Sequence, residues 1–347
     1  MINFTKISNW KPSKNVLEIE TIDAHTEGEP LRVVIKGFPS LKGNTILEKR
    51  DQIIKNYDHI RKAIMLEPRG HADMYGAVIT EPEKKSSDFG VIFMHNDGYS
   101  TGCGHAVIAI SKILVETGAI KITEPETEIN MDVPSGTIKA FVKIKNKIPD
   151  SVRFVNVPSF VEKMDAKILI PKLGNINYDL AFGGAYYAIV NADEVGLGLQ
   201  DLKANSVIDL GMKIKNAIAK EVKIKHPNIV EMNFLYGTIF TFPSTNKNNH
   251  SKNICVFANG EVDRSPTGTG VSARAAVHFA RNEIKLNETI KIESIIGSTF
   301  EVKVIEKIKI GLLNGVIPEV KGTANITGKN TFWIDSSDNI GEGFMLR

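Results

Sequence analysis

The chain has 347 residues, more than one small hydrophobic core supports, so two domains are expected. Its 43 basic and 40 acidic residues are spread along the chain without a basic block, which argues against nucleic-acid binding. The N-terminal segment MINFTKISNWKPSKN lacks the apolar stretch of a signal peptide, and no apolar run approaches about 18 residues. We therefore expect no membrane association and a cytoplasmic protein. Two cysteines and eight scattered histidines have no metal-ligand spacing, so no metal site and no disulfide are expected.

The first half of the chain combines strand patterns with two helices. Thr45 and Glu48 have the spacing of a capping box, and one amphipathic helix is predicted after them with the apolar stripe Ile53, Tyr57, Ile60 and Ile64. Polar loops are predicted at 23–30 and 68–73. Alternating or continuous apolar residues predict strands over 17–23, 31–35, 77–80, 90–95, 127–132, 137–144 and 152–157.

The segment GYSTGCGHA, residues 98–106, places Cys103 between two glycines. The apolar residues that follow it predict a buried helix with Gly118 as its C-cap, so Cys103 is expected at the helix N-terminus. A helix N-terminus stabilises an anion by roughly 1–2 kcal/mol, which would lower a thiol pKa from about 8.5 toward roughly 7.5. The segment therefore suits a thiolate base or a bound carboxylate, and it equally suits a small, inert core cysteine.

The second half repeats this order. Ser206 is the predicted N-cap of a helix with the apolar stripe Val207, Leu210, Ile214, Ile218 and Val222. Strands over 236–242 and 253–258 flank a polar loop at 244–251, which is expected to be exposed and mobile. The segment DRSPTGTG, residues 263–270, then leads into a second buried helix over 271–280. Strands follow over 289–293, 299–305, 316–320 and 331–334.

The spacing of matching landmarks indicates an internal duplication. Thr45 and Ser206 lie 161 positions apart, and Cys103 and Thr267 lie 164 positions apart. Both halves contain an amphipathic helix, strands, a glycine-flanked loop and a buried helix in the same order, as a duplicated α/β unit would. If the two units face each other, both loop-to-helix junctions offer backbone N–H groups to the same small anion in a shared cleft.

Three motifs resemble the proline racemase family: DAHTEGEP at 23–30, CGHA at 103–106 and DRSPTGTG at 263–270. The match follows the family's order over nearly the whole chain, although Gly102 stands where many members have methionine. The resemblance implies an α/β fold of two similar diaminopimelate-epimerase-like domains, each with strands around a central helix, related by a pseudo-twofold axis. We place the first domain at 1–160 and the second at 161–329, and we expect the tail 330–347 to pack back onto the first.

Thr267 is the informative departure from the family pattern. Members that racemise or epimerise have a second cysteine there, so that one thiol removes the Cα proton and the other delivers a proton to the opposite face. A threonine hydroxyl has far too high a pKa to act as a general base near neutral pH. Elimination needs only one Cα base, and with Cys103, Thr267 and the lead-in 98–101 the chain resembles the trans-3-hydroxy-L-proline dehydratases.

The resemblance and the charges imply roles for the site residues. Cys103 is the expected Cα base for a syn loss of water, and Cys103 or His105 protonates the leaving hydroxyl, while Thr267 contributes hydrogen bonding and packing. The product is Δ1-pyrroline-2-carboxylate, formed without a cofactor. The backbone N–H groups expected to bind the substrate carboxylate belong to Gly104, His105, Gly268 and Thr269.

Several of these residues also have structural interpretations. Asp263 resembles the residue that binds the substrate ammonium, and it also suits a loop-capping role. His105 suits a structural histidine, Cys255 a core cysteine, and His25 and Glu27 either the mouth of the site or a structural role. The glycines at 268–270 lack the Gly-Lys-Ser/Thr sequence of a phosphate-binding loop.

Three functions remain open from the sequence. The first is the dehydratase, the second a proline racemase or hydroxyproline 2-epimerase, and the third a non-catalytic imino-acid-binding protein. In each case the partner is a small imino acid, and a homodimer is an expectation that the sequence leaves open.

Overall fold

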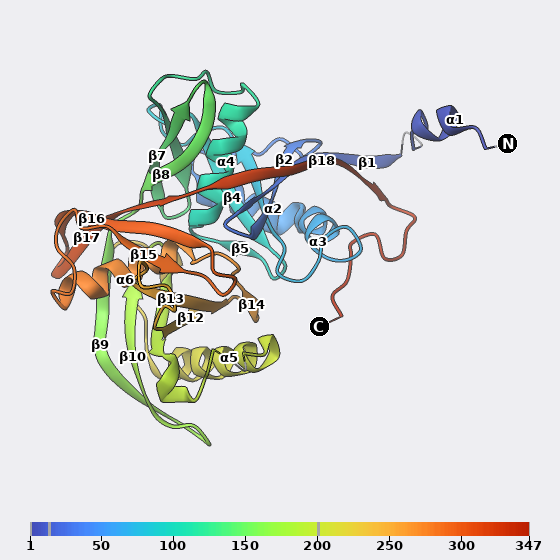
Figure 1. Ribbon diagram of the computed structural model, residues 1–347. Coiled ribbons are helices and arrows are strands. Elements are labelled where there is room, and N and C mark those ends of the chain that lie inside the picture. The colour runs from blue at the N-terminus through green and yellow to red at the C-terminus, as the bar shows by residue number, and fades with distance from the viewer. Residues whose placement is uncertain (1, 13–14, 200–201, 347) are drawn as a thin grey trace.

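The computed structural model describes residues 2–12, 15–199 and 202–346 (Figure 1). Parts of the predicted domains and tail, namely residues 1, 13–14, 200–201 and 347, lie outside this range. The helices are α1 (Phe4–Ser8), α2 (Ile46–Asn56), α3 (Asp58–Met65), α4 (Gly104–Glu116), α5 (Ala204–Glu221) and α6 (Gly268–Ala280), with 3₁₀ turns η1 (Ala192–Val195) and η2 (Val230–Met232). No helix in the described residues is long and apolar enough to span a membrane.

The strands form one network of hydrogen-bonded neighbours, which makes the fold an α/β fold with a strand-rich, barrel-like sheet. Those up to residue 155 are β1 (Val16–Thr26), β2 (Glu29–Lys36), β3 (Tyr75–Thr80), β4 (Phe89–His95), β5 (Tyr99–Ser100), β6 (Glu126–Val133), β7 (Gly136–Lys145) and β8 (Ile148–Val155). The others are β9 (Ser159–Ile170), β10 (Gly174–Phe182), β11 (Tyr186–Asn191), β12 (Leu235–Phe242), β13 (Ser251–Phe257), β14 (Glu261–Val262), β15 (Ile290–Glu293), β16 (Thr299–Ile310), β17 (Leu313–Gly322) and β18 (Ala324–Asp335).

Two buried helices of 13 residues each, α4 and α6, form the centre of the fold. The first packs against β1, β2, β7, β8 and β18, and the second against β9, β10, β11, β16 and β17. Their apolar side chains belong to one continuous core, which includes Val107, Ile110, Val271 and Ala275. Helices that are apolar on nearly all sides need such enclosure, so the strands around them follow from the composition of the two helices.

Long-range strand pairing brings the C-terminal part of the chain back to its start. β18 pairs antiparallel with β1 from Val16 opposite Asp335 to Thr26 opposite Ala324, and Figure 1 shows the red β18 running to the blue β1. β17 pairs with both β8 and β9 and so joins the strands around the two central helices. The domain boundaries at 160 and 329 stay a prediction.

One predicted helix and one predicted helix start need correction. The single amphipathic helix after Thr45 is two helices, because Tyr57 leaves the helical conformation and separates α2 from α3. The capping box of Thr45 and Glu48 is present as predicted. The next predicted N-cap, Ser206, lies inside the first turn of α5, because the Val207 N–H already bonds to the Lys203 carbonyl and Lys203 is the N-cap.

The sequence patterns gave no elements for 158–191, where the structure has β9, β10 and β11. A turn at Lys172 and Gly174, both with positive φ, connects β9 to β10, and PKLG at 171–174 was the available turn signal. The polar loop at 244–251 is exposed over 245–248 as expected, but Ser244 and Asn249 anchor it by donating to the Glu293 carboxylate. Its mobility stays a prediction.

Candidate active site

The N-termini of α4 and α6 meet head to head at the centre of the molecule. Cys103 is the N-cap of α4, and Thr267 is the N-cap of α6. A Cβ atom added to Gly104 would lie 2.6 Å from the Cα atom of Gly268, so this approach requires glycine on both helices. The backbone N–H groups in the first turn of α4 therefore lie close to those in the first turn of α6. The dipoles of the two helices favour an anion between these N–H groups.

A small cavity lies at this meeting point. All seven residues expected at the site line it: Cys103, Gly104, His105, Asp263, Thr267, Gly268 and Thr269. Its other lining residues are Gly102 and four aromatic residues that the sequence analysis did not identify: Tyr75, Tyr187, Tyr236 and Phe257. The combination of apolar rings with a few convergent polar groups is typical of a small-molecule site.

The aromatic side chains are held in defined positions around the cavity. Tyr187 shares a 2.7 Å hydrogen bond with the Thr269 hydroxyl, and the Tyr75 ring lies edge-on to His105 with a centroid distance of 4.8 Å. Tyr236 packs on Phe257 with a centroid distance of 5.4 Å. Tyr75 and Phe257 lie at the ends of strands that the sequence did predict, next to polar loops, and this was the signal available for finding them.

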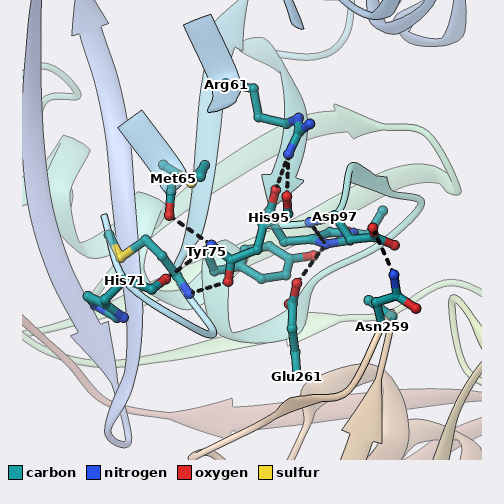
Figure 2. A network of polar contacts seen from close by, with 12 residues as sticks. Arg61, Met65, His71, Tyr75, His95, Asp97, Asn259 and Glu261 are labelled. Carbon is teal, nitrogen blue, oxygen red and sulfur yellow. Dashed lines mark hydrogen bonds and ion pairs between the residues drawn. The ribbon is translucent and has the colours of Figure 1, made fainter. Parts of the chain in front are cut away.

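Tyr75 also lies beside a network of polar contacts, which Figure 2 shows. The Tyr75 ring stacks on His95, and His95 Nδ1 lies 3.1 Å from the Glu261 carboxylate. Asn259 donates to Asp97, and this hydrogen bond joins the loop before β14 to the loop after β4. Arg61 on α3 donates to the backbone carbonyl of His95 and so anchors the loop after β4 to α3.

The environment of Cys103 differs from the expectation for an exposed helix end. Burial raises the pKa of the Cys103 thiol well above its ordinary value, and the nearby Asp263 and Glu29 carboxyl groups add to this effect. The predicted lowering of this pKa is therefore wrong for the enclosed site. Desolvation shifts a pKa by up to about 3–5 units, more than the roughly one unit that a helix dipole supplies.

His105 is a neutral neighbour of the thiol. Its Nδ1 lies 3.1 Å from Cys103 Sγ, and burial lowers the pKa of the imidazole to about 3. The backbone carbonyl of His105 accepts a 2.7 Å hydrogen bond from the Thr26 hydroxyl, which ties α4 to β1. At neutral pH the resting pair is thus an uncharged thiol beside an uncharged imidazole.

Asp263 is the acidic group of the cavity. Burial raises its pKa to about 6, and Asp263 Oδ1 accepts a 2.7 Å hydrogen bond from the Ser265 N–H, so the residue also caps its own loop. Behind it lies Glu29, fully buried, whose Oε2 accepts a 2.6 Å hydrogen bond from the Arg264 N–H. Burial and the neighbouring Asp263 charge raise the pKa of Glu29 well above its ordinary value.

The other residues of the DAHTEGEP motif have structural contacts. His25 Nδ1 accepts from the Gly28 N–H, and Glu27 Oε1 accepts from the N–H and hydroxyl of Thr323. Neither residue lines the cavity. Cys255 is buried in β13 within the apolar core and does not line the cavity either.

Thr267 has a strained backbone, with φ +68° and ψ +97°. Positive φ is rare for a β-branched residue and is typical of functional sites that the surrounding structure holds in place. The Thr267 N–H donates to Ser265 Oγ at 3.1 Å, while Thr267 Oγ1 is buried close to the Asp263 carboxyl group and the Cys255 thiol.

Comparison with known proteins gives a consistent result. The family model described as proline racemase matches residues 21–345. A trans-3-hydroxy-L-proline dehydratase of Colwellia psychrerythraea is 47% identical, covering 99% of this chain and 97% of its own, and one of Burkholderia ambifaria is 42% identical, covering 95% and 98%. The crystal structure of a hydroxyproline epimerase from Agrobacterium vitis with bound trans-4-hydroxy-L-proline superposes with a TM-score of 0.90 at 29% identity, covering 96% of both chains. The protein belongs to the proline racemase family.

Proposed function

We propose that the protein is a hydro-lyase, a trans-3-hydroxy-L-proline dehydratase that uses no cofactor. The observation that carries the proposal is the pairing of Cys103 with Thr267 at opposing helix ends of one cavity. Cys103 supplies one thiol for proton abstraction, and a threonine hydroxyl opposite it is not a base near neutral pH. The names of the Colwellia and Burkholderia relatives support the same assignment.

The proposed binding mode uses the charges of the cavity. The substrate carboxylate accepts hydrogen bonds from the N–H groups of Gly104, His105, Gly268 and Thr269, and the ring ammonium pairs with Asp263. The carboxylate then lies between two positive helix ends, where charge that develops on it during proton removal is stabilised. The ammonium offsets the negative charge of Asp263, which lowers the pKa of Cys103 when substrate binds.

The proposed reaction is a syn elimination on one face of the ring, because the hydroxyl of trans-3-hydroxy-L-proline lies on the same face as the Cα hydrogen. After substrate binding, Cys103 loses its thiol proton to solvent. The Cys103 thiolate takes the Cα proton, the C–H electron pair forms the Cα–Cβ double bond, and the C3–O bond breaks. The hydroxyl leaves with a proton as water, and the enamine tautomerises to Δ1-pyrroline-2-carboxylate.

We assign the proton on the leaving hydroxyl to Cys103, which returns the proton it has just removed. The alternative donor, His105, has a pKa of about 3 in this site and is not an imidazolium at neutral pH. A neutral imidazole N–H is a far weaker acid than a thiol. His105 then acts by accepting a hydrogen bond from the thiol, 3.1 Å away, and keeping Sγ oriented.

The finer architecture is part of the same proposal. Two domains, 1–160 and 161–329 with the tail 330–347 on the first, are related by a pseudo-twofold axis that exchanges α4 and α6. The helices α4 and α6 have equal length, and they contact each other at Gly104 and Gly268. Both observations support this relation. A homodimer and a cytoplasmic location stay predictions from the sequence.

The test is incubation with trans-3-hydroxy-L-proline, trans-4-hydroxy-L-proline and L-proline, followed by chiral chromatography. We expect Δ1-pyrroline-2-carboxylate from the first and no D-configured product from the others. A 2-epimerase, which the name of the Agrobacterium vitis structure favours, would instead form the 2-epimer of the hydroxyproline. Binding of all three without turnover would identify an imino-acid-binding protein and refute the proposal.

A further inference from the structure

The strained Thr267 backbone must be held by its surroundings. Residues in such conformations cost on the order of 1–3 kcal/mol each and persist only where neighbouring contacts determine them. The local contact is the hydrogen bond from the Thr267 N–H to Ser265 Oγ. It holds the N–H end of the Pro266–Thr267 peptide group, and the carbonyl end of the same planar group, that of Pro266, needs a partner of its own.

That group is Asn253 on β13. Its side chain is buried, and Asn253 Nδ2 donates a 3.0 Å hydrogen bond to the Pro266 carbonyl. Asn253 Oδ1 accepts a 2.7 Å hydrogen bond from Arg274 Nη1 on α6. A guanidinium offers donors only, so the amide oxygen must face Arg274 and the amide nitrogen must face Pro266.

Arg274 is itself held by His278, which Glu283 in turn orients. Arg274 Nη2 lies 3.0 Å from His278 Nε2, and His278 Nδ1 lies 2.5 Å from Glu283 Oε2. Since the guanidinium can only donate, His278 Nε2 accepts and His278 Nδ1–H donates to the carboxylate. Burial lowers the pKa of Arg274 to about 10, so the group is still a cation at neutral pH.

We propose that Asn253, oriented by Arg274, is a positioning residue that holds the Pro266 carbonyl and thereby the strained Thr267 backbone at the N-terminus of α6. This conformation aims the Gly268 and Thr269 N–H groups into the cavity, where the substrate carboxylate is proposed to bind. The inference rests on the proposed function for its ligand, a planar or ring-bearing carboxylate, but it concerns the shape of the α6 end rather than the reaction.

The test uses Asn253→Asp, which removes the donor to Pro266 and keeps an acceptor for Arg274. A carboxylate beside the buried Arg274 cation is electrostatically compatible, so the fold is expected to survive. Binding of pyrrole-2-carboxylate should weaken by roughly tenfold or more, because one buried hydrogen bond is lost and a carboxylate oxygen then faces the Pro266 carbonyl. Calorimetry measures this binding without any turnover, so a failed dehydratase assignment leaves the test intact.

The matched control is Thr238→Val on the adjacent strand β12. The Thr238 hydroxyl is buried and donates a 3.0 Å hydrogen bond to the Gly211 carbonyl of α5, not to the α6 end. This variant loses one buried side-chain-to-carbonyl bond of the same kind, and its affinity should change less than about twofold, within the spread of conservative substitutions. Equal affinity losses in both variants would overturn the proposal, because a general loss of stability would then explain them.

A double-mutant cycle separates positioning from general packing. Glycine adopts positive φ without strain, so Thr267→Gly removes the need for a holding group. The effect of Asn253→Asp should shrink from roughly tenfold to less than about threefold in that background if the two positions are coupled. An undiminished effect would refute coupling through Thr267. If Asn253→Asp fails to fold, Asn253→Ala in the same cycle gives the same contrast with the same two outcomes.

Discussion

The N-termini of α4 and α6 meet at the cavity in similar frameworks, but they differ in the side chain and in the backbone conformation of the N-cap residue. At the end of α4, Cys103 has an ordinary extended backbone, with φ −152°, and its side chain contacts His105. At the end of α6, Thr267 has φ +68°, and a buried chain of polar side chains lies behind it. The α4 end thus has a reactive side chain on a relaxed backbone, and the α6 end has an inert side chain on a strained one.

This difference suggests a division of labour. A thiol can act chemically from a relaxed position, because its function depends on Sγ and on the surroundings that set its pKa. An end that binds a carboxylate depends on the direction of its N–H groups, which the backbone conformation determines. Strain at Thr267 is therefore consistent with an α6 end that binds and does not transfer protons.

The largest expected effect on activity comes from removing the thiol at the N-terminus of α4. Cys103→Ser should lower kcat by roughly 10²–10⁴, the usual contribution of a general base, because a serine hydroxyl cannot take the Cα proton without a partner. The matched control is Cys255→Ser, in the core and outside the cavity lining. Steady-state kinetics on trans-3-hydroxy-L-proline measures both variants, and a fully active Cys103→Ser enzyme would remove this residue from the mechanism.

The next effect tests whether both ends bind one anion. Pyrrole-2-carboxylate is planar at the ring carbon, like the deprotonated intermediate, and should inhibit competitively. Its amide should bind roughly 10–100-fold more weakly, because hydrogen bonds to a charged group contribute about 1.5–3 kcal/mol. Inhibition constants for acid and amide measure the difference, and equal constants would contradict a site built on helix-end N–H groups.

How much of this comparison could be predicted depends on what each end uses. Cys103 and Thr267 were placed at helix N-termini from glycine-flanked loops and apolar runs, and the structure brings all seven expected site residues to one cavity. The aromatic lining and Glu29 were missed, because their positions depend on long-range packing of strand ends. The pKa of Cys103 was expected to fall because only the helix dipole is visible in the sequence, whereas burial decides it.

The fold shows the same division. Strands with clear alternation and both buried helices were predicted, while β9 to β11 had no assigned pattern and one predicted helix breaks at Tyr57. Periodicity continues across that break, since α2 and α3 bury their stripes in the same cluster with Ile53, Ile60 and Ile64. A periodic stripe therefore reports a shared buried face, and it does not report whether the backbone is continuous.

A third effect concerns pH. Asp263 must be ionised to pair with the substrate ammonium, and burial raises its pKa to about 6, so kcat/KM should fall as the pH drops through about 6. Below that value the fall should steepen from about tenfold toward about a hundredfold per pH unit, since the Asp263 carboxylate and the Cys103 thiolate then each take up one proton. Because the pKa of Cys103 is also raised in the free protein, kcat/KM should keep rising on the alkaline side. Asp263→Asn should lose the limb near pH 6, and a limb that persists in this variant belongs to another group.

A substitution that makes the two helix N-termini alike should have a smaller effect. Thr267→Cys places a thiol opposite Cys103, and the side chain is close in size, so the fold should tolerate it. Racemase or 2-epimerase activity should appear, weaker than dehydration because the rest of the cavity lining is that of a site with one thiol. D-Proline formation from L-proline, measured by chiral chromatography in wild type and variant, decides the point. If the wild type already inverts L-proline as fast as it dehydrates its hydroxylated substrate, the one-base mechanism is wrong.

The smallest expected effect isolates the backbone of each end from its side chain. At Thr267, with φ +68°, glycine should be more stabilising than alanine by about 1 kcal/mol, because a Cβ is disfavoured in left-handed conformations. At Cys103, with φ −152°, alanine should be more stabilising than glycine by roughly 0.5–1 kcal/mol, because glycine gains more chain entropy on unfolding. Denaturant unfolding of the variants Thr267→Gly, Thr267→Ala, Cys103→Gly and Cys103→Ala measures both differences. Comparing alanine with glycine at one position removes the contribution of the original side chain, which both variants lose. Opposite signs at the two positions would place the strain in the backbone of the α6 end alone, whereas the same sign at both would mean that Thr267 is not strained in solution.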